Sequence, residues 1–219
     1  MTFSWNSFAA ARERMVREQL AERGICDARV LDAMCAVPRH EFVPESLWPQ
    51  AYEDHPLPIG EEQTISQPYI VAAMLEHLAL RGSEGVLEIG AGSGYVTALL
   101  SILCAEVFSV ERHASLARAA EATLERLGYR NVRIKVGDGS LGWAEHAPFD
   151  AVLVSAATAA VPPALLEQLK DGGRMIIPVG SSTSQELQLI RKVNGGSEVT
   201  SLEGCRFVPL VGGEVTPEF

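Results

Sequence analysis

The segment GVLEIGAGSGYVTALLSILCA, residues 85–105, joins a short apolar strand, a glycine turn and an apolar helix without interruption. Glycine lets a backbone turn sharply and lets a ligand approach without a Cβ in the way. The dinucleotide pattern G-x-G-x-x-G would need glycine at 95, where Tyr95 stands, so the pattern is E-x-G-x-G-x-G from Glu88. We therefore expect the first strand of a ligand-binding sheet and disfavour a nicotinamide oxidoreductase.

Downstream of this segment, apolar strands and helices alternate. The expected strands are 106–111, 131–139, 150–157 and 173–180, and the expected helices are 95–105, 114–128 and 162–170. Near-continuous apolar strands that alternate with helices indicate a parallel sheet covered on both faces. Residues 185–193 and 198–212 then form two long strands around the turn NGGS, which predicts an antiparallel pair at one edge.

Upstream, the pattern is helical. Apolar residues recur at helical spacing over residues 7–23, and a second helix, 28–37, follows Asp27 as its cap. A third helix is expected over 67–80. Residues 38–66 carry five prolines and many apolar side chains, so they predict a long ordered loop with a functional role. The expected fold is an α/β doubly wound sheet with an N-terminal helical cover.

We expect a single domain over residues 1–219. Within it, residues 1–80 would supply the N-terminal helices and a substrate loop, and residues 81–219 would supply the cofactor-binding sheet.

The composition limits the possible partners. The chain is 47% hydrophobic and 21% charged, which is ordinary for a globular domain, and its net charge is −10. An acidic chain has no basic footprint for nucleic acid, and a membrane surface would repel it. Any anion that it binds needs a local site.

The four cysteines form no CxxC pair and no metal-ligand spacing. We interpret them as reduced core thiols of a cytoplasmic protein without a metal site. The N-terminus lacks the regions of a signal peptide, and no apolar run is long enough to span a bilayer.

Two acidic residues stand where the second and third strands end. Glu111 could accept both hydroxyls of a ribose, and Asp138 lies at the same rim of the sheet. Each also has a structural explanation, because Glu111 could be an exposed acid at a helix start and Asp138 a turn residue. The glycine segment could likewise be only a tight turn. Their common position, at the ends of successive strands, favours a cofactor site.

This order of motifs resembles the Rossmann-like methyltransferases that use S-adenosylmethionine. The resemblance implies that Gly90, Gly92, Ser93 and Gly94 lie against the methionine and ribose part of the cofactor. It also implies that Glu111 binds the ribose, and that Asp138, with Gly139 beside it, binds the adenine.

More specific motifs precede and follow the sheet. VPRHEFVP (37–44), PLPIGEEQTISQPYIVAAM (56–74), APFDAVLVSAA (147–157) and RFVPLVGGE (206–214) resemble the protein-L-isoaspartate O-methyltransferase family. The resemblance runs from about Met15 to Glu214. It implies isoaspartyl-containing proteins and peptides as substrates, a cytosolic and usually monomeric protein, and an unusual order of the last sheet strands. Site residues are implied as well: Ser66 as the active-site residue and Thr64, Ile65, Gln67, Arg206 and Val208 as substrate contacts.

The implied chemistry fits a sequence without an obvious general base. An isoaspartyl link leaves a free α-carboxylate, whose pKa near 3.5 makes it a nucleophile already at neutral pH. Its methyl ester would close spontaneously to a succinimide, whose hydrolysis returns some normal aspartate. The histidines form no triad pattern, and they stand at positions 40, 55, 77, 113 and 146.

Ser66 has two interpretations. It could be the N-cap of the third helix, with Gln67 and Pro68 in the first turn, or its hydroxyl could donate to the substrate carboxylate. The two are compatible, because the free N–H groups of a helix N-terminus also attract anions.

Three alternatives to isoaspartyl methylation remain at this point. One is a relative that methylates an aspartate in one dedicated peptide, although such relatives carry further C-terminal sequence and this chain stops at Phe219. Another is a non-catalytic S-adenosylmethionine-binding protein, which the intact Ser66, Glu111 and Asp138 disfavour. The third is the oxidoreductase that Tyr95 disfavours.

Overall fold

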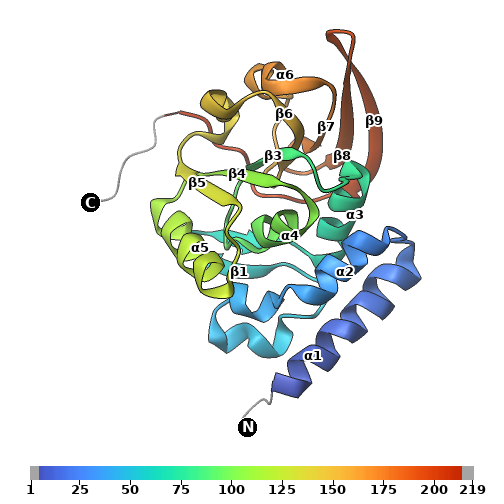
Figure 1. Cartoon of the computed structure of the whole chain (residues 1–219), viewed down its shortest axis with the longest axis vertical. Helices are drawn as coiled ribbons and strands as arrows, with labels where there is room; N and C mark the ends of the chain where they lie inside the picture. Colours follow the sequence, from blue (N-terminus) through green and yellow to red (C-terminus); the bar gives the residue numbers. More distant parts are fainter. Residues whose placement is uncertain (1–4, 214–219) are drawn as a thin grey trace.

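The computed structural model describes residues 5–213, and residues 1–4 and 214–219 lie outside the described part. The last residue of the RFVPLVGGE motif, Glu214, therefore falls outside it. Figure 1 shows the N-terminal helices on one side of the molecule and a twisted sheet on the other. The α-helices are α1 (Trp5–Arg14), α2 (Ala28–Ala36), α3 (Pro68–Leu78), α4 (Tyr95–Leu103), α5 (Ala114–Leu127) and α6 (Pro163–Gln168).

One sheet of seven strands organises the molecule, in the order β5-β4-β3-β6-β7-β8-β9. The strands are β3 (Gly85–Ile89), β4 (Glu106–Glu111), β5 (Val132–Val136), β6 (Phe149–Val154), β7 (Leu169–Gly180), β8 (Gln185–Val193) and β9 (Gly196–Cys205). The strands β5, β4, β3, β6 and β7 pair in parallel, in this order, and β8 and β9 are antiparallel additions at one edge. The predicted fold class is confirmed, and the last two strands follow in chain order.

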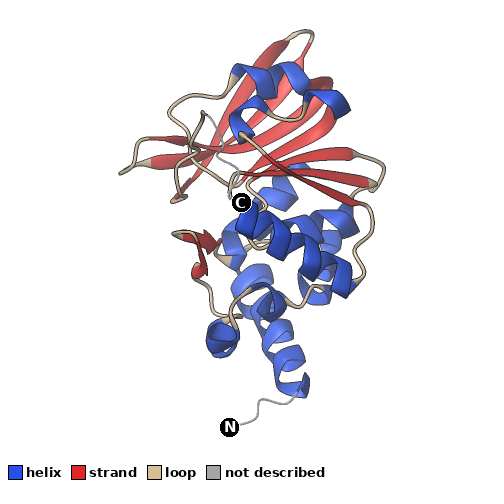
Figure 2. Cartoon of the chain, turned by 90° about the vertical axis from the view of Figure 1, so that its left-hand side faces the viewer, coloured by secondary structure: helices blue, strands red, loops and turns tan. Residues whose placement is uncertain are grey.

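The two faces of the sheet have separate cores because successive side chains of a strand point to opposite faces. Val86, Val107 and Ala151 pack under the N-terminal helices, α3, α4 and α5. Their neighbours Leu87, Phe108 and Val152 pack on the face that α6 covers. Figure 2 shows this asymmetry, with many helices below the sheet and a small group above it. The central strands β3, β4 and β6 are therefore buried on both faces, as the interior of a parallel sheet requires.

The first predicted helix is one continuous helical stretch that passes through three helix types, α, π and 3-10. The α1 segment continues as a π-helix, Met15–Leu20, and a 3-10 turn, Ala21–Arg23. Gly24 ends it with φ +102°, a conformation that glycine adopts without a Cβ penalty. The predicted cap of the second helix is confirmed, because the Asp27 side chain accepts a hydrogen bond from Arg29 N.

The long ordered loop predicted over residues 38–66 contains regular elements that the sequence did not predict. The loop contains two 3-10 turns, Arg39–Phe42 and Glu45–Gln50, and a small antiparallel hairpin of β1 (Leu57–Gly60) and β2 (Gln63–Ile65). The hairpin escapes prediction because its two turn residues are glutamates in left-handed conformations, not the asparagine–glycine pair that marks such turns.

The last predicted strand is too long. β9 ends at Cys205, and the residues after it leave the edge and run back across the carboxyl ends of the parallel strands. Ala157 N donates to Val208 O over 2.8 Å, and Leu210 N donates to Ala157 O over 2.7 Å. We refer to residues 206–213 as the C-terminal crossing segment. The apolar alternation of this segment continues that of β9, so the sequence alone does not show where the strand ends.

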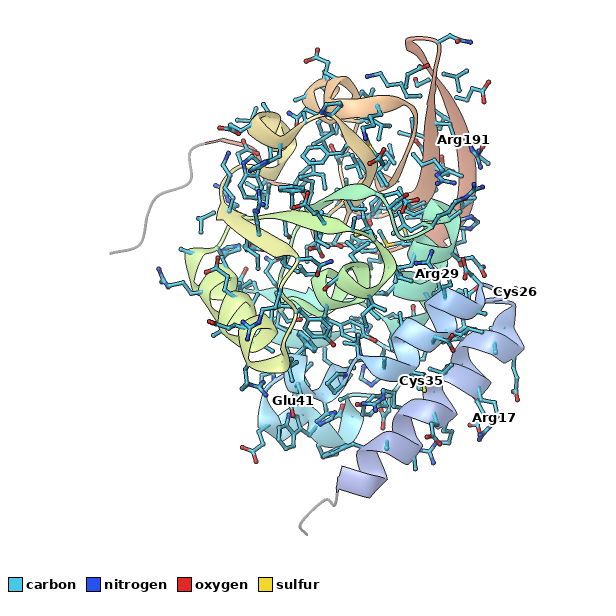
Figure 3. The ribbon with its side chains drawn as sticks, viewed as in Figure 1. Arg17, Cys26, Arg29, Cys35, Glu41 and Arg191 are labelled. Atoms are coloured by element: carbon cyan, nitrogen blue, oxygen red, sulfur yellow. The ribbon has the colours of Figure 1, made fainter. Side chains whose placement is uncertain are left out.

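The cysteines are unpaired, as predicted, but only Cys104 is buried and Cys26 is exposed. The interpretation as four core thiols is therefore wrong for Cys26. Figure 3 shows Cys35 on α2 and Cys26 at the turn before it. Over residues 5–213, no helix is long and apolar enough to cross a membrane. The boundary at residue 80, within one domain over 1–219, stays a prediction.

Candidate active site

A cavity lies at the carboxyl ends of β3, β4 and β6, where the chain order of the strands reverses. Open α/β sheets bind ligands at this point. The residues that line the cavity come from the ends of the strands, the β1–β2 hairpin and the C-terminal crossing segment: Gln63–Ser66, Ile89–Ser93, Tyr95, Val96, Val110–His113, Gly139, Ser155, Ala156 and Val208–Val211. Most of the predicted cofactor residues are among them.

The glycine turn forms the floor of the cavity. Gly92 has φ +54°, and a Cβ at this residue would lie 3.2 Å from Ile59 Cδ1 of the hairpin. Gly94 does not line the cavity, and a Cβ there would lie 3.2 Å from the Cβ of Ala120 in α5. Gly92 thus lets the hairpin pack against the turn, whereas Gly94 lets α5 pack against the start of α4.

A buried carboxyl supports the turn from below. Glu88 Oε2 accepts hydrogen bonds from Thr97 Oγ1 at 2.6 Å and Ser109 Oγ at 2.7 Å, and the side chain has no exposed area. Burial raises the pKa of Glu88 to about 7, although the two hydroxyls oppose this effect. Glu88 therefore joins β3, β4 and α4 and does not itself line the cavity.

Glu111 is fixed at the wall of the cavity. Its Oε2 accepts from Gly92 N and its Oε1 from His113 N, each at 2.8 Å, and the residue is only 5% exposed. A carboxylate oxygen has two lone pairs, so each oxygen keeps one acceptor position. The side chain is held ready to accept from a further pair of donors, such as two ribose hydroxyls.

Asp138 is placed differently from Glu111. Its Oδ1 accepts from Ser140 N and Oγ, and its Oδ2 accepts from Gly213 N at 2.7 Å. Partial burial acts to raise the pKa of Asp138, but the hydrogen bonds from the Ser140 side chain and from the Gly213 and Ser140 N–H groups together hold this pKa below its ordinary value. The cavity is lined by Gly139 and not by Asp138. The adenine role of Asp138 thus stays a prediction.

The C-terminal crossing segment covers the cavity from the side of Asp138. Arg112 Nη1 donates to Val211 O at 3.1 Å and to Gly213 O at 3.4 Å. Together with the bond from Gly213 N to Asp138, these contacts hold both ends of the covering residues 211–213.

The hairpin closes the opposite side. Its turn residue Glu61 accepts from Ser115 Oγ at 2.7 Å, and its other oxygen lies 3.9 Å from His113 Nδ1. Both partners belong to the start of α5 or the residue before it, so the hairpin is held to the segment that follows β4.

Ser66 lies where this cavity meets a second hollow, a broad cleft. The cleft is lined by the hairpin end, the start of α3, the loop between β7 and β8, and the C-terminal crossing segment: Pro56, Thr64, Ser66, Gln67, Ile70, Ser155, Ala157–Ala159, Gly180–Gln185 and Gly204–Leu210. Thr64, Ser66, Ser155 and residues 208–210 belong to both linings. The cavity and the cleft therefore adjoin each other beside Ser66.

The interpretation of Ser66 as a helix cap is wrong. Gln67 occupies the N-cap position of α3 and makes no side-chain cap. The carboxylate of Asp54 takes that role instead, because its Oδ1 accepts from Tyr69 N at 3.1 Å and its Oδ2 from Gln67 Nε2 at 2.7 Å. Asp54 also pairs with Arg23. The helix terminus is thus already occupied by an anion of the chain itself.

The predicted substrate residues fall on the two hollows. Thr64, Gln67, Arg206 and Val208 line the cleft, whereas Ile65 lines only the cavity. Arg206 is the one charged residue in the lining of the cleft, within the described residues. Tyr95, Arg112, His113, Ser155 and Ala156 line the cavity without having been predicted as ligands. Arg112 and His113 directly follow the predicted strand 106–111, and that position was the available signal.

No three His, Cys, Asp or Glu side chains among residues 5–213 gather where they could hold a metal ion. A family model described as protein-L-isoaspartate(D-aspartate) O-methyltransferase matches residues 10–215 of this chain. The chain belongs to this family. Family membership confirms the predicted enzyme class, a protein methyltransferase that depends on S-adenosylmethionine.

Curated members of the protein-L-isoaspartate O-methyltransferase family resemble the chain over nearly its full length. Protein-L-isoaspartate O-methyltransferase 1 of Syntrophobacter fumaroxidans is 55% identical over 206 residues, which cover 94% of this chain and 96% of the relative. The Koribacter versatilis protein-L-isoaspartate O-methyltransferase is 55% identical over 207 residues, which cover 94% and 93%.

Solved structures of the family share the fold. One protein-L-isoaspartate O-methyltransferase has a TM-score of 0.82 at 33% identity and covers 93% of this chain and 67% of its own. A Plasmodium falciparum structure described under the same family name, in complex with S-adenosyl-L-homocysteine, has a TM-score of 0.81 at 28% identity and covers 91% and 98%.

Proposed function

We propose that this chain methylates the free α-carboxylate of L-isoaspartyl residues in damaged proteins and peptides. The methyl ester would then close to a succinimide, and its hydrolysis would begin the repair of the peptide link. The observation that carries the proposal is the position of Ser66 at the junction of the cofactor cavity and the peptide-sized cleft.

The cavity suits S-adenosylmethionine in its donor set and its shape. Gly92 lets a ligand approach the turn, Glu111 keeps two acceptor positions for the ribose hydroxyls, and Gly139 lies on the side proposed for the adenine. When bound, S-adenosylmethionine supplies a methyl group on a positively charged sulfur. The chain holds the cofactor between the hairpin and the C-terminal crossing segment, which exclude water from the reacting atoms.

The cleft suits a polypeptide that carries an anion. Its lining is almost entirely neutral, with hydroxyl groups in residues 181–184 and the single cation of Arg206. Ser66 would donate its hydroxyl to the substrate carboxylate, with Thr64 and Gln67 on one side and Val208 on the other. Because Asp54 occupies the end of α3, the substrate anion would depend on Ser66 rather than on free helix amides.

No general base is required, because the substrate carboxylate is ionised at neutral pH. The chain has only to hold this carboxylate beside the methyl group and to remove water. Positioning of this kind can contribute several kcal/mol to the barrier reduction. We further propose that the chain acts in the cytoplasm as a monomer on proteins and peptides, with no nucleic acid or membrane partner.

Methyl transfer to paired synthetic peptides tests the proposal. One peptide contains an aspartyl residue, the other the isoaspartyl isomer, and labelled S-adenosylmethionine reports the product. We expect methylation of the isoaspartyl peptide and little of the aspartyl one. Equal methylation of both peptides would favour an aspartyl methyltransferase. Methylation of neither peptide, with intact cofactor binding, would favour an enzyme for one dedicated peptide or a non-catalytic binding protein.

A further inference from the structure

Arg39 reaches Ser66 from inside the protein. It begins the 3-10 turn Arg39–Phe42, and its side chain has no exposed area. Its Nε donates to Ala51 O at 2.9 Å, and its Nη2 donates to Ser66 O at 2.8 Å. The guanidinium thus joins the 3-10 turn to the backbone of the residue that would hold the substrate carboxylate.

The positive charge of Arg39 has no carboxylate in contact with it. Among the described residues, no acidic oxygen forms an ion pair with it within 4.0 Å, and its buried Nη1 has no hydrogen-bond partner. Its guanidinium carbon lies 4.9 Å from the centre of the Tyr95 ring. Asp54 acts on it through space, but Asp54 is already paired with Arg23. Arg39, Asp54 and Arg23 together carry a net charge of +1, in a chain whose net charge is −10.

The turn that carries Arg39 is held in place on its other side. Glu41 Oε2 lies 2.9 Å from Arg126 Nη2 of α5, and the Phe42 ring meets the Tyr95 ring edge-on at 5.7 Å. Figure 3 labels Glu41 near the end of α5, and neither Glu41 nor Arg126 lines the cofactor cavity. Arg39 therefore cannot move toward solvent without breaking contacts on both sides of the turn.

We propose that Arg39 is a positioning residue for methyl transfer: it fixes the backbone of Ser66, and its unpaired buried charge favours an anion beside the Ser66 hydroxyl. A fixed charge in a site that excludes water acts more strongly than the same charge in solvent. The substrate carboxylate supplies the counter-charge that the free protein lacks. The inference rests on the proposed function, because it assigns the electrostatics of that same site.

The test compares a carboxylate with its neutral isostere. Two peptides are used, one with an L-isoaspartyl residue and one in which its α-carboxylate is an α-carboxamide. Their dissociation constants are measured by calorimetry in the presence of S-adenosyl-L-homocysteine, on the parent protein and on Arg39→Met. KM and kcat are measured with the isoaspartyl peptide.

We expect Arg39→Met to bind S-adenosyl-L-homocysteine within about threefold of the parent. Its preference for the carboxylate over the carboxamide should fall at least tenfold, which corresponds to about 1.4 kcal/mol. KM should rise, and Arg39→Lys, which keeps the charge, should recover part of the preference. An unchanged preference in Arg39→Met, with both peptides weakened equally, would show that Arg39 is only structural and would overturn the proposal.

Arg29 provides a matched control. Its guanidinium, labelled in Figure 3, also donates to two backbone carbonyls, those of Leu80 at 2.5 Å and Leu103 at 3.0 Å. None of these three residues lines the cavity or the cleft. Arg29→Met should lower stability without changing the carboxylate preference.

A second variant decides the matter if Arg39→Met does not fold. Asp54→Asn removes the anion that opposes Arg39 and should strengthen binding of the carboxylate peptide relative to the carboxamide. Equal effects on both peptides would count against the proposed electrostatics. Methylation by the parent protein tests the proposed function separately from the role of Arg39. A parent protein that methylates isoaspartyl peptide supports the proposed function whatever the variants show.

Discussion

At the scale of single residues, Ser66 is free for a substrate because Asp54 caps α3 in its place. Its carbonyl is held by Arg39, and within residues 5–213 no hydrogen-bond partner is found for its hydroxyl. The backbone is therefore fixed while the side chain remains available. A hydroxyl that donates to a carboxylate would contribute about 1.5–3 kcal/mol.

This arrangement predicts that Ser66→Ala separates stability from activity. The unfolding free energy should change by less than about 0.5 kcal/mol, because the variant loses no hydrogen bond in the free protein. Catalytic efficiency with isoaspartyl peptide should fall roughly 10- to 100-fold, as expected for one charge-assisted hydrogen bond. Denaturant unfolding and steady-state kinetics measure the two quantities. Ser182→Ala, which alters another hydroxyl of the cleft, is the control, and parental activity in Ser66→Ala would remove Ser66 from the site.

Glu88 predicts a pH dependence of stability. Its pKa is raised from 4.5 to about 7 in the folded protein, so between these values the folded state binds more protons than the unfolded state. The unfolding free energy therefore falls as pH rises through this window, by about 3 kcal/mol for this group alone. Glu88→Gln removes this titration. Its unfolding free energy relative to that of the parent should therefore be higher at pH 8 than at pH 5.

Denaturant unfolding of the parent and Glu88→Gln at both pH values tests this expectation. The difference between the two proteins should shift in favour of the variant at the higher pH. A difference that is the same at pH 5 and pH 8 would mean that Glu88 does not titrate between them.

At the scale of elements, the sequence predicts the parallel sheet well because its strands are short apolar runs that are buried on both faces. The glycine turn and Glu111 follow from the same pattern, since they stand directly at strand ends. The hairpin is missed because Glu61 and Glu62 take left-handed conformations that only tertiary contacts explain, among them the bond from Ser115 to Glu61. The end of β9 and the cap from Asp54 depend on contacts between distant segments, which local patterns do not contain.

The contact between the hairpin and the glycine turn gives a prediction at this scale. Gly92→Ala would place a Cβ 3.2 Å from Ile59 Cδ1 and should displace the hairpin. We expect the affinity for S-adenosyl-L-homocysteine to fall about tenfold, and Ile59→Ala in the same chain to restore part of it. Calorimetry on the single and double variants measures this coupling.

The control for backbone strain is Gly128→Ala. Gly128 has φ +88° and no atom within 4 Å of a Cβ, so this change strains the backbone without touching the hairpin. It should lower stability by about 1 kcal/mol and leave ligand affinity unchanged. Strictly additive effects of the changes at 92 and 59 would show that the hairpin does not press on the turn.

At the scale of the whole molecule, the chain carries a net charge of −10, whereas its proposed substrate is an anion. Long-range attraction cannot guide an acidic peptide to such a surface. Recognition must therefore come from the short-range groups of the cleft, Ser66 and Arg206 among them.

The absence of a titrating nucleophile gives a prediction for the complete reaction. Initial rates under saturating substrates should be nearly flat from about pH 6 to 8, because the substrate carboxylate titrates far below this range. Initial-rate assays corrected for ester loss measure the profile. If a pH slope of the parent is lost in Glu88→Gln, it comes from the titration of Glu88 in the scaffold. If the slope is retained in Glu88→Gln but lost in His113→Gln, it assigns a proton transfer to His113, which lines the cavity.

The C-terminal crossing segment has a consequence for how the protein is made. Residues 208–211 complete the cofactor cavity, although the parallel strands beneath it end with β7 at Gly180. During translation the parallel strands up to β7 are synthesised first, and β8 and β9 follow before the covering segment. A chain that has not been synthesised past residue 211 lacks part of the lining and should bind the cofactor more weakly than the 219-residue chain. A nascent chain must therefore reach the folded sheet with less help from its ligand, and stalled or prematurely terminated products should retain S-adenosylmethionine less well.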